Sequence, residues 1–454
     1  MSIRLSFLGG VGTVTGSKYL LELDDLRILI DCGLFQGFKQ LRLRNWAAMP
    51  VDPKGINAVV LTHAHLDHSG YVPLFVKKGF AGPIICTEAT SDLCRILLPD
   101  SGHLQEKDAE YANRHGFSKH QPALPLYTLE DAKLSLDRFT PVIFRQEREI
   151  TRRLSVRFLP AGHILGAAIV EVKCAGLTVI FSGDLGRPGS ATMVDPTPMR
   201  RADYLLVEST YGDRRHGAQD PEMALAEVII RTAARGGTVL VPAFAVGRAQ
   251  TLLFHLQRLK ATKRIPDVPV FLDSPMAIDA SELFCKHLGE HKLTADQCRT
   301  ACGVARYVRE AEESKALDQH PMPKVILSAS GMATGGRVLH HLKHYAPDPR
   351  NTILFTGFQA SGTRGAAMTA GAESVKIHGA YVPIRAEVAT LQMLSAHADA
   401  DEIMDWLSNF AAPPRMTFVT HGEPAASDAL RHRIEEELGW ACIVPEHREE
   451  VALR

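Results

Sequence analysis

The sequence predicts an α/β protein in which a two-layered α/β domain is interrupted by a second α/β domain with a mostly parallel sheet. Up to about residue 210, short apolar runs follow one another closely and are separated by Gly and Asp, which is typical of consecutive strands. From there to residue 372, helix-length segments alternate with apolar strands, which indicates parallel strands joined by crossover helices. Short strands then return. We therefore expect the first domain to comprise residues 1–209 and 373–454, and the inserted domain to comprise residues 210–372.

The first part of the chain contains two groups of expected strands. The first group begins with three runs that are expected to be antiparallel: residues 5–10, 18–24 and 26–33. A buried strand at residues 57–62 runs directly into the polar loop HAHLDHSG and then into a helix over residues 71–79, and this order repeats from residue 83. Residues 100–139 are polar, and we expect helix and loop there. The second group comprises residues 154–163, 167–174, 177–184 and 204–210.

The inserted domain alternates between the two kinds of element. Its expected helices are residues 221–235, 247–260 and 335–345. Its expected strands are residues 238–245, 268–274, 324–330 and 351–358. In the last part of the chain, short strands are expected within residues 374–391, 416–422 and 442–453, with helices around 401–407 and 427–439.

Composition excludes several classes of protein. Hydrophobic residues make up 45% and charged residues 22%, unlike disordered, collagen-like or coiled-coil chains. No apolar run approaches the 18 or so residues of a membrane span, and the first residues lack a secretory leader, so we expect a cytoplasmic protein without a membrane partner. Lys and Arg total 51, as do Asp and Glu, so no global positive field attracts nucleic acid. The eight cysteines lack Cys-X-X-Cys spacing and are expected to be buried reduced thiols, in neither disulfides nor a thiolate metal site.

The segment THAHLDHSG is the strongest functional signal. His63, His65, Asp67 and His68 lie within six residues at the end of an apolar strand. Alternate residues of an extended segment point to the same side, so His63 and His65 can bind one ion while Asp67 and His68 face a neighbouring position. A His-rich surface loop is the alternative, but so many imidazoles at this density favour a cation.

A zinc site needs further ligands from other segments. His163 in LPAGHILGA, Asp184 in FSGDLG and His421 in FVTHGE each follow an apolar run and stand next to glycine. Taken alone, a loop His is usually solvated, and an Asp before a turn is usually a capping residue. Asp31 in LIDCG also ends a strand. It is expected either to accept an N–H from a ligand imidazole, which fixes the tautomer, or to cap a turn.

Taken together, LIDCG, HAHLDH, AGH, SGD and THG resemble, in order and context, the metallo-β-lactamase superfamily, over almost the whole chain. The resemblance extends to its β-CASP branch of nucleic-acid-processing nucleases, which carries a large insert before the last His. Here Asp184 and His421 are 237 residues apart (421 minus 184). The resemblance implies an αββα sandwich interrupted by a β-CASP domain with a mostly parallel sheet. The third motif of the branch falls on His421, and a His at this position is similar to the RNA-processing subgroup.

The resemblance implies a dizinc centre. One Zn²⁺ would take His63, His65 and His163, and the other Asp67, His68 and His421, with Asp184 bridging the two. A hydroxide shared by the two ions would attack a phosphodiester bond of single-stranded RNA and leave a 5′-phosphate and a 3′-hydroxyl. Asp67 and Asp31 are also expected to be catalytic residues.

Two further motifs of the branch match this chain. The acidic motif falls on Glu208 in VESTYG, and the histidine motif falls on His397 in SAHADADE. The resemblance implies that His397 protonates the leaving 3′ oxygen and that Glu208 orients the ring and favours the imidazolium. A surface carboxylate and a helix-capping neighbour are the alternatives for these two positions.

The insert is expected to hold the substrate. SASGMATGGR runs from a strand through a Gly-rich turn into a helix, so Ser330 and Gly331 lie where backbone N–H groups cradle phosphate, although a packing turn is the equal alternative. The candidates for contact with the RNA backbone are Arg248, Arg337, Lys343 and Arg364, and the alternative for each is a solvated side chain without substrate. The family resemblance places this contact in a groove between the two domains that admits a single strand.

Two other functions stay open at this point. A hydrolase of small esters or thioesters fits the metal motif, but the long insert counts against it. A non-catalytic RNA-binding subunit would usually have lost ligands, whereas all seven ligand positions are filled here. The segment LQMLSAHAD also lacks the Asp or bulky aromatic that several members carry before the motif Ser. The oligomeric state stays open, with a homodimer as one alternative.

Overall fold

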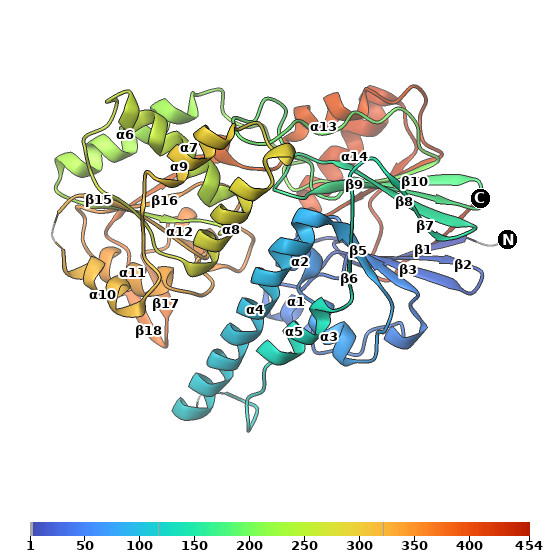
Figure 1. Cartoon of the computed structure of the whole chain (residues 1–454), viewed down its shortest axis with the longest axis horizontal. Coiled ribbons are helices and arrows are strands. Elements are labelled where there is room, and N and C mark those ends of the chain that lie inside the picture. The colour runs from blue at the N-terminus through green and yellow to red at the C-terminus, as the bar shows by residue number, and fades with distance from the viewer. Residues whose placement is uncertain (1–2, 117, 321) are drawn as a thin grey trace. The chain divides into compact units, whose positions relative to one another are not determined.

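The computed structural model describes residues 3–116, 118–320 and 322–454. The chain divides into two units (Figure 1): unit 1 comprises Met1–Arg215 and His397–Arg454, and unit 2 comprises His216–Ala396. The insert is expected from the sequence to end at residue 372, whereas unit 2 of the structure continues to Ala396. The reason is that β19 (Glu387–Thr390) pairs with β16 (Thr352–Phe355) and so belongs to the sheet of unit 2.

Unit 1 contains two seven-stranded sheets. In sheet order, the first consists of β22 (Glu450–Leu453), β1 (Ile3–Gly9), β2 (Lys18–Leu23), β3 (Leu26–Ile30), β4 (Ala58–Val60), β5 (Ile84–Thr87) and β6 (Phe139–Val142). The second consists of β21 (Cys442–Ile443), β20 (Met416–Thr420), β11 (Tyr204–Glu208), β10 (Leu177–Phe181), β9 (Ala168–Cys174), β8 (Leu154–Pro160) and β7 (Glu147–Thr151). The first three runs pair antiparallel, as expected, and β3 to β6 pair parallel.

The two sheets of unit 1 enclose one apolar core. Residues such as Phe7 and Val60 of the first sheet, and Phe158 and Phe418 of the second, belong to a single cluster of buried side chains. This burial explains why β4 and β11 read as continuous apolar runs instead of alternating ones. The helices of unit 1 are α1 (Lys39–Arg44), α2 (Leu66–Ser69), α3 (Val72–Lys77), α4 (Glu88–His115), α5 (Leu129–Leu136), α13 (Ala400–Leu407) and α14 (Pro424–Leu438). Among these, α4 packs on β5 and β6, and α14 packs on β20 and β21, which gives the expected αββα order (Figure 1).

Unit 2 is built on a six-stranded sheet whose pairs are all parallel. Its order is β14 (Arg306–Tyr307), β13 (Val270–Leu272), β15 (Lys324–Ser328), β12 (Thr238–Pro242), β16 and β19. The helices are α6 (Pro221–Ala234), α7 (Arg248–Ala261), α8 (Pro275–Lys286), α9 (Ala295–Cys302), α10 (Ala311–Gln319), α11 (Val338–Tyr345) and α12 (Arg364–Thr369). A separate hairpin is formed by β17 (Ser374–Ile377) and β18 (Ala380–Pro383). The parallel sheet agrees with the alternation of helices and strands in the insert.

One expectation about cysteine is wrong. The structure joins Cys285 on α8 to Cys298 on α9 by a disulfide, whereas all eight cysteines were expected to be reduced thiols. The pairing depends on two helices packing together, which the spacing of cysteines along the chain does not show.

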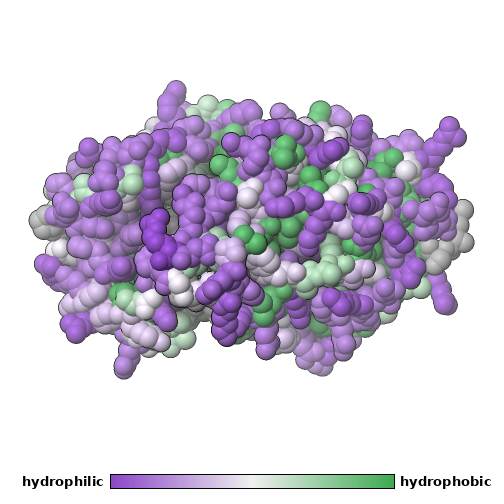
Figure 2. All heavy atoms as spheres, turned by 90° about the horizontal axis from the view of Figure 1, so that it is seen from below, coloured by the Kyte–Doolittle hydropathy of each residue, from purple (hydrophilic) through white to green (hydrophobic). Residues whose placement is uncertain are grey.

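The face drawn in Figure 2 is mostly polar. Figure 2 shows hydrophilic side chains over most of the face that it draws, with hydrophobic residues in small groups among them. Among the described helices, none has the combination of length and apolar character that crossing a bilayer requires.

Candidate metal centre

The predicted ligands stand at the carboxyl ends of strands in unit 1. His63 and His65 follow β4, and α2 then begins and carries Asp67 and His68. Asp184 follows β10 in the other sheet. Because β10, β11 and β20 are neighbouring parallel strands, the residues that follow them meet at one edge of the sheet. His163 follows β8, which runs in the same direction as β10.

The first group of donors comprises three imidazoles and one carboxylate. Donor atoms of His63, His65, His163 and Asp184 all lie within 4.8 Å of one another. Nδ1 of His65 is 3.2 Å from Nε2 of His63 and 3.3 Å from Nε2 of His163. Oδ2 of Asp184 is 3.5 Å from Nε2 of His63 and 3.6 Å from Nε2 of His163. The four donors therefore surround one position.

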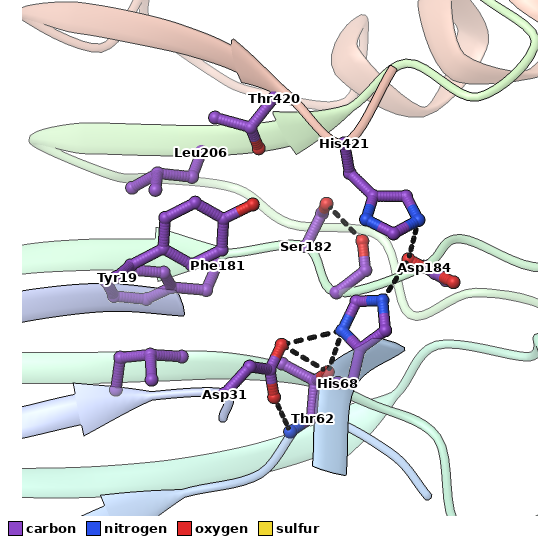
Figure 3. Close-up of a pocket in the computed structure, with 12 residues that line it drawn as sticks. Tyr19, Asp31, Thr62, His68, Phe181, Ser182, Asp184, Leu206, Thr420 and His421 are labelled. Carbon is purple, nitrogen blue, oxygen red and sulfur yellow. Dashed lines mark hydrogen bonds and ion pairs between the residues drawn. The ribbon is translucent and has the colours of Figure 1, made fainter. Parts of the chain in front are cut away.

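The second group lies on the other side of the same carboxylate. Donor atoms of Asp67, His68 and His421 also lie within 4.8 Å of one another. Oδ1 of Asp184 is 3.3 Å from Nε2 of His68 and 3.5 Å from Nε2 of His421. Asp184 thus turns one oxygen toward each group, and Figure 3 shows its side chain between His68 and His421.

Asp31 and Thr62 orient His68 from behind (Figure 3). Oδ2 of Asp31 accepts a hydrogen bond from Nδ1 of His68 at 2.8 Å, which leaves Nε2 to face Asp184. The same carboxylate accepts bonds from the backbone N and the Oγ1 of Thr62, at 2.7 and 2.9 Å. A carboxylate behind an imidazole that fixes its tautomer is a common device at metal sites.

Close backbone packing supports the loop that carries Asp67. A Cβ atom built on Gly33 would stand 1.6 Å from the carbonyl oxygen of Asp67, so only glycine fits at this position. The backbone N of Ser17 donates to that same carbonyl oxygen at 2.9 Å. The hydroxyl of Ser17 lies 2.9 Å from Nδ1 of His421, so the N-terminal loop contacts both ends of the second group.

The donors fit a divalent metal. Nε2 of His68 and Oδ1 of Asp184 are fully buried and face each other at 3.3 Å, but neither has a partner with hydrogen-bond geometry. Leaving such atoms without a partner costs free energy, which a cation between them would offset. Imidazole nitrogen and carboxylate oxygen are ligands that zinc accepts.

The electrostatics favour metal-binding forms for most of these side chains. Burial and the neighbouring His68 hold the pKa of His63 well below its usual range. Burial also lowers the pKa of His421 to about 3, so both rings are neutral at pH 7. Burial alone would raise the pKa of Asp184, but the imidazoles of His421 and His68 hold it well below its usual range, so this carboxylate is charged. Neutral imidazoles and ionised carboxylates are the forms that ligate metals.

Glu208 and His397 form a pair beside the first group. Glu208 ends β11 and is fully buried, and its Oε1 and Oε2 lie 3.1 and 3.3 Å from Nδ1 of His397. Nε2 of His397 faces the ligands, 4.0 Å from Oδ2 of Asp184. Burial opposes the charged ring, but Glu208 outweighs burial and raises the pKa of His397. The pair therefore favours the protonated ring, whose Nε2 faces the metal ligands.

The residues predicted to bind substrate lie in unit 2, and several have structural partners. Arg337 donates to Oδ1 of Asp273 and to the carbonyl oxygens of Val308 and Arg309. Arg364 donates to three backbone carbonyl oxygens, two of which belong to the Gly-rich turn at Ala333 and Thr334. Gly331 packs against the ring of Phe244, which a Cβ atom would meet at 2.6 Å.

The other predicted contacts lie on the same unit. The hydroxyl of Ser330 accepts hydrogen bonds from the backbone N of Thr334 and of Gly335, so it closes the turn. Arg248 begins α7 and is buried, whereas Lys343 in the last turn of α11 is exposed. Contact of these residues with RNA stays a prediction.

Two supporting residues have no clear signal in the sequence. Thr62 adjoins the HAHLDH segment, and its position next to His63 is the one feature that points to it. Ser17 lies about 400 residues from its partner His421 along the chain, and only the packing of the N-terminal loop brings them together.

Three family models match consecutive parts of the chain. The model of the metallo-β-lactamase superfamily matches residues 11–216, the Beta-Casp domain matches residues 249–368, and the Zn-dependent metallo-hydrolase RNA specificity domain matches residues 381–445. The first and third of these ranges together contain all the metal-ligand positions described above.

Several known proteins match over most of the chain. Ribonuclease TTHA0252 from Thermus thermophilus is 38% identical over 429 residues, which cover 93% of this chain and 93% of that protein. Transcription termination factor FttA from Methanocaldococcus jannaschii is 31% identical, and the match covers 93% of this chain and 67% of the factor. An RNase J-like protein from the same organism is 29% identical over 98% of both chains.

A solved structure supports the fold. The crystal structure of a protein of unknown function from Enterococcus faecalis covers 100% of both chains with a TM-score of 0.54 and 14% sequence identity. At that identity the likeness concerns the fold alone.

Proposed function

The chain belongs to the β-CASP ribonucleases of the metallo-β-lactamase superfamily, and we propose that it is a dizinc enzyme that hydrolyses single-stranded RNA. A divalent metal is supported by the family and by the gathered donors. Two zinc ions are proposed because the donors fall into two groups that share Asp184.

The ligands divide into two sets in this proposal. His63, His65 and His163 would hold one ion, Asp67, His68 and His421 would hold the other, and Asp184 would contact both. When bound, such ions activate water at neutral pH and neutralise phosphate oxygens. The protein supplies the fixed, buried frame: Asp31 and Ser17 orient the rings of His68 and His421, so little reorganisation is needed during the reaction.

His397 is proposed as the general acid. Its Nδ1 is occupied by Glu208, and its Nε2 faces the ligands, so the proton at Nε2 can pass to the 3′ oxygen that leaves the phosphate. Glu208 acts through His397 by holding the ring in place and favouring its protonated form. The products would then carry a 5′-phosphate and a 3′-hydroxyl.

RNA is proposed as the substrate for two reasons. Residues 381–445 match a domain whose name refers to RNA specificity, and relatives that align along most of the chain are named as ribonucleases. We propose a cytoplasmic location for this activity, with a monomer or a homodimer as the active form. Small-ester hydrolysis has no observation in its favour beyond the shared metal motif.

The carboxylate of Asp184 between two groups of imidazoles is the observation that carries this function. The test compares the purified chain with His397→Ala, with metal content measured by inductively coupled plasma mass spectrometry. We expect equal zinc in both proteins and a loss of about 10²- to 10⁴-fold in the cleavage rate of end-labelled single-stranded RNA. Loss of zinc in the variant would contradict the acid role.

Substrate class is tested in the same preparation. Single-stranded RNA, the matching duplex and a thioester are assayed side by side, with and without chelator. We expect cleavage of the single strand only, abolished by chelator and restored by zinc. Hydrolysis of the thioester without cleavage of RNA would refute the proposed substrate.

A further inference from the structure

Three sulfur atoms gather in unit 2. Cys285 lies near the end of α8, and Cys298 and Cys302 lie one helical turn apart on α9. The structure joins Cys285 to Cys298, and the Sγ of Cys302 lies 3.6 Å from the Sγ of Cys285. The two helices pack against each other (Figure 1), so the cluster lies across a helix-to-helix contact within one unit.

Helix geometry explains why Cys285 can meet either of the other two sulfurs. Residues four apart on a helix lie on the same face, so Cys298 and Cys302 both face α8. The Cα atoms of Cys285 and Cys298 are 5.7 Å apart, which is within the usual range for a disulfide. Cys285 on α8 is therefore within reach of both Cys298 and Cys302 on α9.

The three cysteines differ in their access to solvent. Cys298 is buried, with 1% of its surface exposed, whereas Cys285 and Cys302 are partly exposed. A small reagent in solution can thus reach Cys285 or Cys302 before it reaches Cys298. The other free cysteines, Cys32, Cys86, Cys94, Cys174 and Cys442, are all buried.

We propose that Cys285, Cys298 and Cys302 form a thiol–disulfide exchange site that reacts with hydroperoxides. In this site Cys285 is the sulfur that reacts first, Cys298 closes the first disulfide, and Cys302 exchanges with it. The oxidised forms tie α8 to α9 by a covalent bond that the reduced chain lacks.

The chemistry balances with one hydroperoxide per disulfide. The sulfur of Cys285 attacks the terminal oxygen of the hydroperoxide and the O–O bond breaks. Cys285 becomes a sulfenic acid, and the other oxygen leaves with the thiol proton as an alcohol, or as water when the reagent is hydrogen peroxide. The thiol of Cys298 then displaces the sulfenic hydroxyl as water and forms the disulfide. In the exchange step, the sulfur of Cys302 attacks Cys285, the bond to Cys298 breaks, and Cys298 leaves with the electron pair and takes up a proton.

A metal site is the other use of three sulfurs, and the structure favours exchange. Among the described residues, this group contains the three cysteines and no histidine or carboxylate. Closed structural zinc sites take four protein ligands. The disulfide between Cys285 and Cys298 also uses two of the three donors.

The test uses the zinc-loaded full chain. It is reduced, freed of reductant, exposed to hydrogen peroxide and quenched, and its thiols are alkylated under denaturing conditions and mapped by mass spectrometry. The unaltered chain should lose two of its eight thiols, with Cys285 present in every disulfide peptide. Cys298→Ser should form the bond from Cys285 to Cys302, Cys302→Ser the bond from Cys285 to Cys298, and Cys285→Ser neither bond. Cys442→Ser, in unit 1, is the matched control and should behave as the unaltered chain.

Three results would overturn the proposal. The first is that all eight thiols stay reduced, or that oxidation maps to cysteines outside the cluster. The second is that Cys298→Ser forms no bond between Cys285 and Cys302, which would remove the exchange step. The third is that the reduced chain binds one more zinc than a variant with all three cysteines changed to Ser, which would make the cluster a metal site. Alanine versions, checked by circular dichroism, replace any Ser variant that does not fold.

Discussion

Asp184 shows at the level of one residue how a buried charge can be stable. Its side chain is 2% exposed, and a carboxylate in such a place needs positive partners or hydrogen bonds. The partners here are imidazoles on both sides, of which His68 carries the proton in the absence of metal, since Asp184 and Asp31 outweigh burial and raise its pKa well above the usual range. A divalent cation on each side would replace that proton and satisfy both oxygens.

Asp31 gives the sharpest residue-level prediction. In Asp31→Asn the side chain keeps its shape and tolerates the same backbone φ of 60°, but it loses the negative charge that faces Nδ1 of His68. We expect the affinity for the zinc held by Asp67, His68 and His421 to fall by about 10- to 100-fold. Competition with a chromophoric chelator measures this affinity. Asp25→Asn, at an exposed position in the turn between β2 and β3, is the control and should change nothing.

At the scale of elements, strand order brings the functional residues together. The family resemblance implied that Asp184, Glu208 and His421 gather. The structure brings them together because each ends or follows one of the strands β10, β11 and β20, which are neighbours in the sheet. The four predicted ligands within HAHLDH do not depend on strand order, because the end of β4 followed by α2 brings them together locally.

Other features could not be predicted because they depend on contacts between distant elements. Ser17 reaches His421 through loop packing, and the cysteines meet only because α8 packs on α9. The strands within residues 374–391 were expected to belong to the first domain. The last of these strands, β19, instead pairs with β16 and extends the sheet of unit 2. Local pattern showed the strands there but not the sheet to which they belong.

An ionic network in unit 2, formed by residues of α10 and α11 and by Asp273 after β13, predicts a pH effect. His341 lies with Nε2 2.6 Å from Asp273 and Nδ1 2.8 Å from Asp318, so both ring nitrogens face carboxylates. Burial opposes the charged ring, but these bonds outweigh it and raise its pKa to about 9 from 6.5. Because the folded pKa is the higher one, this stabilisation is fully present below pH 6.5 and is lost as pH rises toward 9.

The free energy of unfolding should therefore fall by up to about 3 kcal/mol between pH 6 and pH 10 from this residue. Guanidinium unfolding followed by circular dichroism measures it, with His341→Gln and His344→Gln compared. His344 is exposed in the same helix and serves as the control. The expected result is that only His341→Gln loses this part of the pH dependence; an unchanged pH profile in that variant would contradict the assignment.

At the scale of the whole molecule, unit 1 is assembled from both ends of the chain around the ligands. The ligands come from four segments, of which the last follows β20, beyond the whole of unit 2. Metal binding should therefore stabilise unit 1 as a unit and leave the parallel sheet of unit 2 unaffected.

Removal of metal tests this selectivity. After chelation, amide hydrogen exchange should become faster in the segments that follow β4, β8, β10 and β20. Without the metal, the buried ligand atoms in these segments lose their partner, and local opening costs less free energy. Exchange in β12 and β15 of unit 2 should stay the same. Equal loss of protection in both units would show that the metal does not act through unit 1 alone.

The most direct test of the dizinc centre is anomalous diffraction from crystals grown with zinc. We expect two zinc peaks per chain, one among His63, His65 and His163 and the other among Asp67, His68 and His421, with one oxygen of Asp184 on each. A single peak, or two peaks with Asp184 bound to neither, would contradict the central claim that this carboxylate joins two metal sites.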